Sequence, residues 1–170
     1  MQHVYVFYLF IGKKYLISIK ETVMFKTILY ILIFFSLVIA SERQNIVDVL
    51  ESYNEAFGNS NYSDIVNYFD YPTSFNLQDK TIGASGRFKL KLIYKKIRGD
   101  LPDYYSYSKW DEIDIQLIDD SIAIVNAKFS RYKNDDTIYD SGAAQYHMRL
   151  VKNEWKIFSL TPYVTIETLD

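Results

Sequence analysis

The sequence of 170 residues contains no cysteine and only two histidines. The absence of cysteine excludes disulfide bonds, thiol catalysis and attachment through a lipidated cysteine. A zinc site with the usual nitrogen and sulfur ligands is excluded in practice, because His147 is the only histidine beyond residue 3. Glycine is also scarce, and Gly83 and Gly86 alone do not make a phosphate-binding loop or a nucleophile elbow. The sequence therefore predicts neither a cofactor nor a metal site.

Long uncharged hydrophobic runs are absent after residue 40, but a run from Thr27 to Ala40 carries no charge. The basic Lys26, the apolar run and the small residue Ala40 follow one another as the three parts of a secretory signal. A membrane-spanning helix needs about 20 apolar residues, so this run is short for a permanent anchor. We predict a signal peptide over residues 24–40, cleaved near Ala40, and a periplasmic or secreted protein. An uncleaved N-terminal anchor is the alternative.

The predicted mature chain, residues 41–170, has the size of one ordinary domain. Four of the 19 Lys and Arg residues and one of the 21 Asp and Glu residues precede it, which leaves 15 basic and 20 acidic residues. This acidic balance disfavours a nucleic-acid binder, whose electrostatic footprint is usually basic. Residues 1–23 show no globular pattern. We interpret them as a non-native upstream extension or as part of a longer, positively charged n-region.

Three helices are predicted in the first half of this domain. Apolar residues recur at three- and four-residue steps from Gln44 to about Gly58, which is typical of an amphipathic helix. A short second helix is predicted to be capped by Ser63 and to end before Pro72. A third is predicted over residues 87–99, with one apolar and one basic stripe.

The second half alternates apolar and polar residues in four runs, at residues 113–117, 123–129, 144–150 and 155–159. The short connections between these runs require antiparallel neighbours, so we predict a four-strand meander. A short hairpin is predicted at residues 73–86. Helices before strands are typical of an α+β fold, with the helices gathered on one face of the sheet.

This order of elements resembles the nuclear transport factor 2-like superfamily, in particular its bacterial SnoaL-like members. The segment "LESYNEAFGNSNYSDIVNYF" is similar to the family's first two helices, "IGASG" to the glycine before its third helix, and "AAQYHMRLVKNEWKIFSL" to its last hairpin. The resemblance covers nearly all of residues 41–163. It implies a cone-shaped, curved antiparallel sheet with three helices on its concave face, an apolar pocket between them, and a homodimer through the outer sheet face. Members include isomerases, dehydratases, cyclases and non-catalytic modules, so the fold does not decide the function.

The resemblance and the strand alternation together imply a ligand pocket lined by Tyr53, Tyr68, Asn76, Trp110 and Tyr146. In the steroid-isomerase branch, a carboxylate base works with a tyrosine and an acidic hydrogen-bond donor. Tyr53 matches the tyrosine, but the base position falls at Asn76, whose amide accepts no proton at neutral pH, and the second donor position falls at Tyr146. Asp70 is the nearest carboxylate. It is either a base at the pocket mouth or a turn residue satisfied by backbone amides.

Three other features have both a functional and a structural interpretation. The basic stripe of the third helix (Arg87, Lys91, Lys95 and Arg98) suits an anion, a lipid headgroup or a partner, or is a solvated helix face. The segment "DYYSYSKW", residues 103–110, suits stacking on a flat ligand. Alternatively it is a strand with Tyr105 and Tyr107 on one face and Ser106, Ser108 and Trp110 on the other. His147 points away from the pocket if its neighbours Tyr146 and Met148 face it.

Three hypotheses for function follow. In the first, an exported domain binds a small apolar or aromatic ligand, or a protein partner, without catalysis. In the second, an isomerase, dehydratase or cyclase uses Asp70 with Tyr53 and Tyr146, which requires Asp70 to lie in a closed pocket within hydrogen-bond reach of a tyrosine. In the third, the domain is a structural homodimer whose cavity is filled by its own aromatic side chains.

Overall fold

The computed structural model describes residues 26–31, 33–34 and 41–163. The chain divides into two compact units, Met1–Arg43 and Gln44–Asp170. In the first unit, residues 26–31 and 33–34 are helical. Residues 1–23 and the predicted cleavage point at Ala40 lie outside the described residues. Within the described part of the chain, no helix has both the length and the apolar character needed to span a bilayer.

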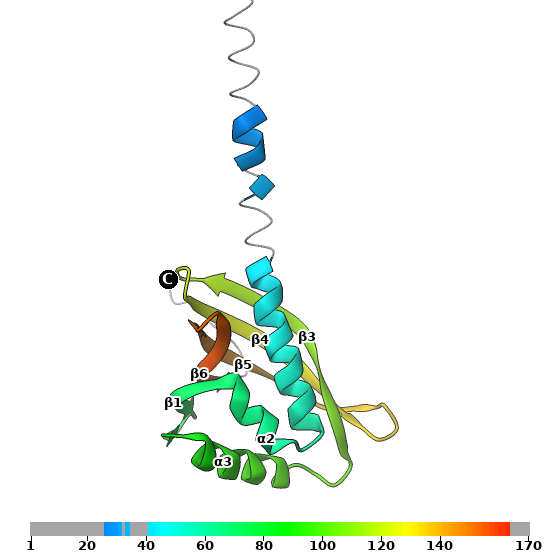
Figure 1. Ribbon diagram of the computed structural model, residues 1–170. Helices are drawn as coiled ribbons and strands as arrows, with labels where there is room; N and C mark the ends of the chain where they lie inside the picture. Colours follow the sequence, from blue (N-terminus) through cyan, green and yellow to red (C-terminus); the bar gives the residue numbers. More distant parts are fainter. Residues whose placement is uncertain (1–25, 32, 35–40, 164–170) are drawn as a thin grey trace, which may run out of the picture. The chain divides into compact units, whose positions relative to one another are not determined.

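Two long helices occupy the first half of the second unit (Figure 1). Residues 41–58 are helical, and the part inside this unit is named helix 44–58 below. The other long helix, α3, spans Arg87–Gly99. Both helices are confirmed, because their apolar stripes repeat at helical spacing and pack into the core. α3 has the predicted bounds, whereas the first helix begins at residue 41, before the predicted start at Gln44.

The predicted second helix is shorter than the sequence suggested. It consists of α2, Tyr62–Ile65, and the 3-10 helix η1, Val66–Tyr68. Asn61 caps α2 in place of Ser63, and its side chain accepts a hydrogen bond from the backbone amide of Asp64. Asn is as good an N-cap as Ser, so the helix begins earlier than predicted, and Phe69 already belongs to the next strand.

Six strands form a single curved sheet in the order β2-β1-β6-β5-β4-β3. They are β1, Phe69–Asn76; β2, Thr81–Ala84; β3, Tyr105–Leu117; β4, Ile122–Lys133; β5, Ile138–Val151; and β6, Glu154–Tyr163. The predicted meander β3–β6 and the predicted hairpin β1–β2 are confirmed. The sheet is mixed rather than wholly antiparallel, because β1 pairs with β6 in parallel. No turn joins these two strands, so no turn geometry sets their relative direction.

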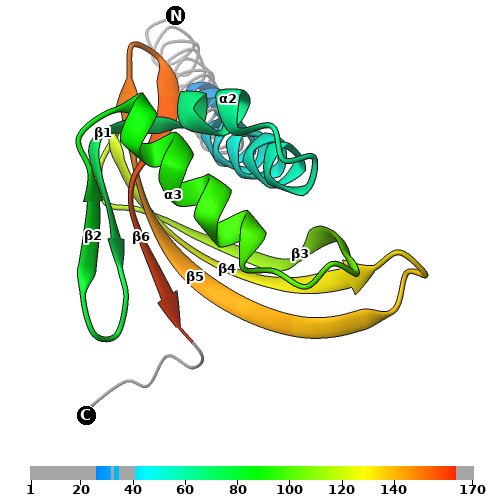
Figure 2. The same cartoon turned by 90° about the horizontal axis from the view of Figure 1, so that it is seen from below.

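The helices lie on the concave face of the sheet, as Figure 2 shows for α3. Ile46 and Leu50 of helix 44–58 and Leu90 and Tyr94 of α3 are almost wholly buried against inward-facing side chains of β4, β5 and β6. The sheet is too strongly curved for the helices to fill the whole concavity. A hollow therefore remains under the two long helices.

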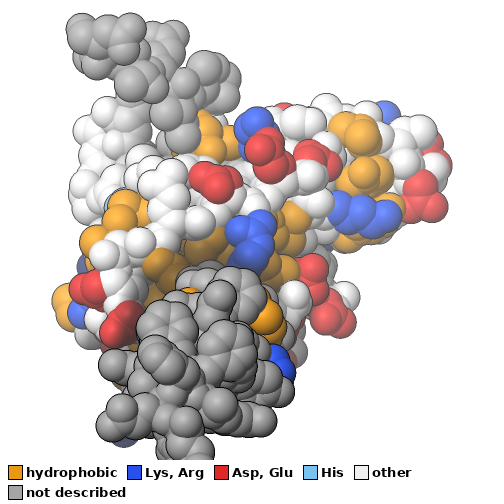
Figure 3. All heavy atoms as spheres, turned by 90° about the horizontal axis from the view of Figure 1, so that it is seen from above, with side chains coloured by type: hydrophobic (Ala, Val, Ile, Leu, Met, Phe, Trp, Pro, Cys, Tyr) orange, Lys and Arg blue, Asp and Glu red, His pale blue; other side chains and the backbone are white. Residues whose placement is uncertain are grey.

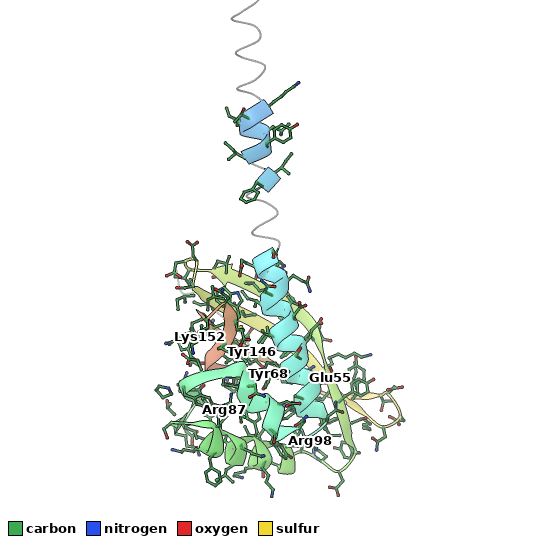
Figure 4. The ribbon with its side chains drawn as sticks, viewed as in Figure 1. Glu55, Tyr68, Arg87, Arg98, Tyr146 and Lys152 are labelled. Atoms are coloured by element: carbon green, nitrogen blue, oxygen red, sulfur yellow. The ribbon has the colours of Figure 1, made fainter. Side chains whose placement is uncertain are left out.

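The basic stripe of α3 has two different environments. Arg87, Lys91 and Lys95 are exposed, whereas Arg98 is half-buried, with its guanidinium carbon 4.4 Å from the centroid of the Tyr105 ring. Figure 4 shows Arg87 and Arg98 at opposite ends of the helix. On the face of the molecule shown in Figure 3, acidic and basic side chains are interspersed over the described part. That distribution is typical of a solvated surface.

Candidate functional site

A cavity of about 260 Å³ lies between helix 44–58, α3 and the concave face of the sheet. Its lining is contributed by both helices and by strands far apart in the sequence: Tyr53, Asn54, Phe57, Phe75, Leu77, Tyr94, Ile97, Ser108, Trp110, Phe129, Arg131, Ala143, Ala144, Tyr146, Leu160 and Pro162. The two-residue period of a strand explains the sheet positions, because every second residue of a strand points to the same face. Phe129 and Arg131 of β4 face the cavity in this way, as do Leu160 and Pro162 of β6.

Strand β3 departs from this simple alternation. The pairing of β3 with β4 shifts register between Tyr105 and Tyr107. An extra residue in one strand switches the faces on either side of it. Tyr105 is therefore buried and its hydroxyl lies 3.0 Å from the Ser108 hydroxyl, whereas Tyr107 stacks on Tyr132 with the ring centroids 4.8 Å apart. The prediction that Tyr105 and Tyr107 share one face is wrong for this reason.

Three buried tyrosines, Tyr53, Tyr94 and Tyr146, meet at the wall of the cavity and are named the tyrosine cluster below. The Tyr94 hydroxyl donates to the Tyr53 hydroxyl oxygen at 3.0 Å, and Tyr146 also hydrogen-bonds Tyr53. The rings pack edge to face, with centroids 5.9 Å apart for Tyr53 and Tyr94 and 6.1 Å apart for Tyr53 and Tyr146. Figure 4 labels Tyr146 beside helix 44–58.

All three hydroxyls of the tyrosine cluster are neutral at physiological pH, because the ordinary pKa of tyrosine is about 10 and burial raises it further. Desolvation raises the pKa of Tyr53, and its hydrogen bonds with Tyr94 and Tyr146 partly offset that rise. Burial likewise raises the pKa of Tyr94 and of Tyr146 well above the usual value. Because the Tyr53 oxygen accepts from Tyr94, the proton of Tyr53 can be donated to another acceptor. A hydroxyl that accepts one hydrogen bond becomes a stronger donor in another, so the cluster can hold an oxygen atom of a ligand.

The remaining polar atoms of the lining lie at Asn54, Ser108 and Arg131. Asn54 Nδ2 donates to the Ser108 carbonyl oxygen at 2.8 Å, which ties helix 44–58 to β3. Trp110 Nε1 donates to the carbonyl oxygen of Leu50 at 3.2 Å and fixes the indole ring in the wall. Asn54, Ser108 and Trp110 also line a second hollow, of about 430 Å³, on the side of Glu51 and Glu55. The Asn54–Ser108 hydrogen bond therefore lies between the cavity and this outer groove.

The structure brings together three of the five predicted pocket residues. Tyr53, Trp110 and Tyr146 line the cavity. Tyr68 is half-buried beside the core and does not line it. Asn76 is also outside the lining, because it points to the face of β1 opposite to its inward neighbour Phe75 and donates to Ser159 Oγ at 2.8 Å. The prediction of Asn76 and Tyr68 in the lining is therefore corrected.

Asp70 lies away from the cavity. Its carboxylate faces the guanidinium of Arg149, with 3.5 Å between Oδ2 and Nε, and it is not part of the lining. Because β1 begins at Phe69, Asp70 is a strand residue on the face opposite to the buried Phe69. Among the described residues that line the cavity, none is Asp, Glu or His. The geometry required for Asp70 as a base is not met, and the lining supplies no other carboxylate or imidazole.

His147 projects from the face of β5 opposite to Tyr146, and its ring centroid lies 6.0 Å from that of Phe158. Among the described residues, no group of His, Asp and Glu side chains is arranged to hold a metal ion. His147 therefore does not contribute to the lining of the cavity.

Arg131 and Tyr94 are the important lining residues that the sequence analysis missed. Arg131 lies two residues beyond Phe129, the last member of the alternating run recognised in this strand, and continuing that alternation would have found it. Tyr94 lies on the apolar stripe of α3, where spacing predicts only a packing role. Its hydroxyl function follows from the meeting of α3 with helix 44–58, which spacing within one helix does not reveal.

A family model described as "NTF2-like protein (DUF6841)" matches residues 41–165. No curated protein matches the chain. Among solved structures, a protein of unknown function with a cystatin-like fold from Nostoc punctiforme is similar, with 11% identity, a TM-score of 0.64, and 74% of this chain and 92% of that chain covered. An NTF-2 like protein of unknown function from Shewanella oneidensis has 16% identity, a TM-score of 0.57, and coverage of 71% and 98%. The protein Aln2 from a Streptomyces species has 9% identity, a TM-score of 0.61, and coverage of 73% and 91%. At these identities the structures show a shared fold.

Proposed function

The chain belongs to the NTF2-like protein family, and on that premise we propose that its domain binds a small aromatic or otherwise apolar ligand in the cavity, without converting it chemically. Sites for small molecules are typically concave and largely apolar, with a few fixed polar groups. The cavity has this composition, with aromatic and aliphatic walls and the tyrosine cluster as a fixed polar group. Export from the cytoplasm and pairing through the outer sheet face stay predictions.

The proposal rests on one observation, a mainly apolar cavity. Hydroxyl groups that can donate hydrogen bonds are present in it, but the described lining residues include no carboxylate and no imidazole. Proton abstraction needs a base within hydrogen-bond reach of the substrate, and the carboxylate of Asp70 is engaged with Arg149 outside the cavity. Ligand pockets usually measure roughly 300–1,000 Å³. A cavity of about 260 Å³ therefore suits a ligand of one or two rings.

Binding of a neutral two-ring probe, naphthalene-2-carboxamide, tests the proposal by isothermal titration calorimetry. The probe is expected to bind the protein with one-to-one stoichiometry. Ala144 lines the cavity and is almost wholly buried, so Ala144→Leu is expected to fill the space and to abolish binding. Ala123 is a buried residue of β4 outside the lining, and Ala123→Leu is the matched control, expected to retain binding. Circular dichroism of both variants confirms that the comparison is made on folded protein.

Two results would overturn the proposed function. One is that the unaltered protein binds neither this amide nor the carboxylate with the same rings. The other is that Ala144→Leu binds the probe as tightly as the unaltered protein does, which would place the probe elsewhere. Native mass spectrometry of the purified protein adds an independent check, because a retained natural ligand appears as a discrete added mass.

A further inference from the structure

We infer that the ligand of this cavity carries a carboxylate group and that Arg131 binds it. The inference rests on the proposed function, because it concerns the ligand of the same cavity. Arg131 is the only basic side chain among the described residues of the lining. It reaches the cavity because it follows the inward-facing Phe129 by two residues along β4.

The guanidinium of Arg131 has donor capacity that the protein leaves unused. Its Nη1 donates to Asp140 Oδ2 at 2.6 Å across the β4–β5 pair, and its guanidinium carbon lies 4.9 Å from the centroid of the Phe129 ring. Its Nε is buried within the protein and is not the atom that a cavity ligand reaches. A guanidinium carries five N–H donors in a fixed fork, so the hydrogen bond from Nη1 to Asp140 leaves further Nη donors for an acceptor supplied by a ligand.

Asp140 does not neutralise Arg131 on the cavity side. The side chain of Asp140 is 44% exposed, against 25% for Arg131, so water screens the carboxylate more strongly than it screens the guanidinium. Asp140 is also absent from the lining of the cavity. The pair therefore presents its positive member to the cavity and its negative member to the solvent.

The electrostatic effect of Arg131 extends to the tyrosine cluster. Burial raises the pKa of Tyr53 and of Tyr146, but the charge of Arg131 acts in the opposite direction on both groups and favours negative charge there. A ligand anion held between Arg131 and the cluster would gain the same stabilisation. With no acidic residue in the described lining to oppose it, the cavity favours an anion over a neutral or cationic ligand.

The shape of the donor set favours a carboxylate among the possible anions. The planar guanidinium fork matches the two oxygens of a carboxylate, and such charge-assisted pairs are the stronger hydrogen bonds in proteins. A phosphate ester carries up to two charges, whereas the described lining offers one cation and no helix N-terminus. The apolar walls then contact the rest of the ligand. The chemical class is a small aromatic carboxylate.

The test compares naphthalene-2-carboxylate with naphthalene-2-carboxamide, which has the same rings and no charge. In calorimetric titrations, the unaltered protein is expected to bind the carboxylate at least about tenfold more tightly than the amide, as a charge-assisted hydrogen bond implies. Arg131→Met is expected to remove this preference by weakening binding of the carboxylate about tenfold or more, while the amide changes less than about threefold. Asp140→Asn frees Arg131 from its partner and is expected to tighten binding of the carboxylate alone.

Arg149 offers a matched control. It too is an arginine over an aromatic ring, with its guanidinium carbon 4.0 Å from the Phe158 centroid, and it too pairs with an aspartate, but it does not line the cavity. Arg149→Met is expected to keep the preference for the carboxylate. Equal binding of carboxylate and amide by the unaltered protein, or an equal loss of both in Arg131→Met, would overturn the inference while leaving the proposed function standing. Binding of neither probe would overturn the proposed function itself.

Discussion

Removal of the Tyr53 hydroxyl is the sharpest test of the tyrosine cluster. In Tyr53→Phe, the ring and its edge-to-face contacts stay, but the oxygen that accepts the hydrogen bond from Tyr94 is lost. The Tyr94 hydroxyl is then left without its partner in a side chain that is only 1% exposed. A buried donor left unsatisfied costs about 1–3 kcal/mol. We therefore expect a loss of about 2 kcal/mol in the free energy of unfolding.

Tyr94→Phe is the matched control for this prediction. It removes the donor itself, so no buried donor is left without its partner. The expected loss is about 1 kcal/mol, the ordinary net contribution of one hydrogen bond. In the double variant, the orphaned Tyr94 hydroxyl no longer exists, so the double loss should fall short of the sum of the single losses by about 1 kcal/mol.

Urea unfolding followed by circular dichroism measures these losses, provided that the slope of the free energy against urea concentration is the same in all variants. The reasoning is refuted if Tyr53→Phe costs no more than Tyr94→Phe. That result would mean that Tyr53 is not the acceptor of the Tyr94 hydroxyl. Additive losses in the double variant would likewise show that the two hydroxyls do not interact.

Three other predictions concern pH, packing and a surface ion pair. The tyrosine cluster has raised pKa values in the folded state. Its contribution to stability is therefore complete below the unfolded tyrosine pKa of about 10 and is lost as the pH rises above that value. The urea midpoint of unfolding should fall as the pH is raised from about 9.5 to about 11, and it should fall less steeply in Tyr94→Phe. In Gly142→Ala, the new methyl group would lie 2.6 Å from Phe129 Cζ. We therefore expect the free energy of unfolding in urea to fall by about 1–3 kcal/mol, and naphthalene-2-carboxamide to bind more weakly because the Phe129 ring is displaced. Unchanged binding would contradict the placement of Phe129. Asp70→Asn should cost less than about 1 kcal/mol, because the pair with Arg149 is partly exposed, and should leave binding of both naphthalene probes unaltered; a loss of binding would return Asp70 to the site.

The element types were predictable from the sequence, because they depend on periodicity within one segment. The apolar steps of helix 44–58 and α3 and the two-residue alternation of β3–β6 predicted these elements, and the structure confirms them. The family resemblance and the strand alternation together placed Tyr53, Trp110 and Tyr146 in the pocket, and these three residues line the cavity. The order of the elements was sufficient to indicate the family, which the matching family model supports.

Which residues meet one another was settled by the tertiary structure alone. A one-residue change of register in β3 reversed the expected face of Tyr105. Asp70 and Asn76 of β1 pair with Arg149 and Ser159 instead of facing the cavity. Tyr94 and Arg131 gained their roles from contacts with Tyr53 and Asp140, which lie 41 and nine residues away along the chain. Periodicity assigns a face within one segment, whereas bulges, strand starts and helix packing fix which faces come together, and these depend on the whole fold.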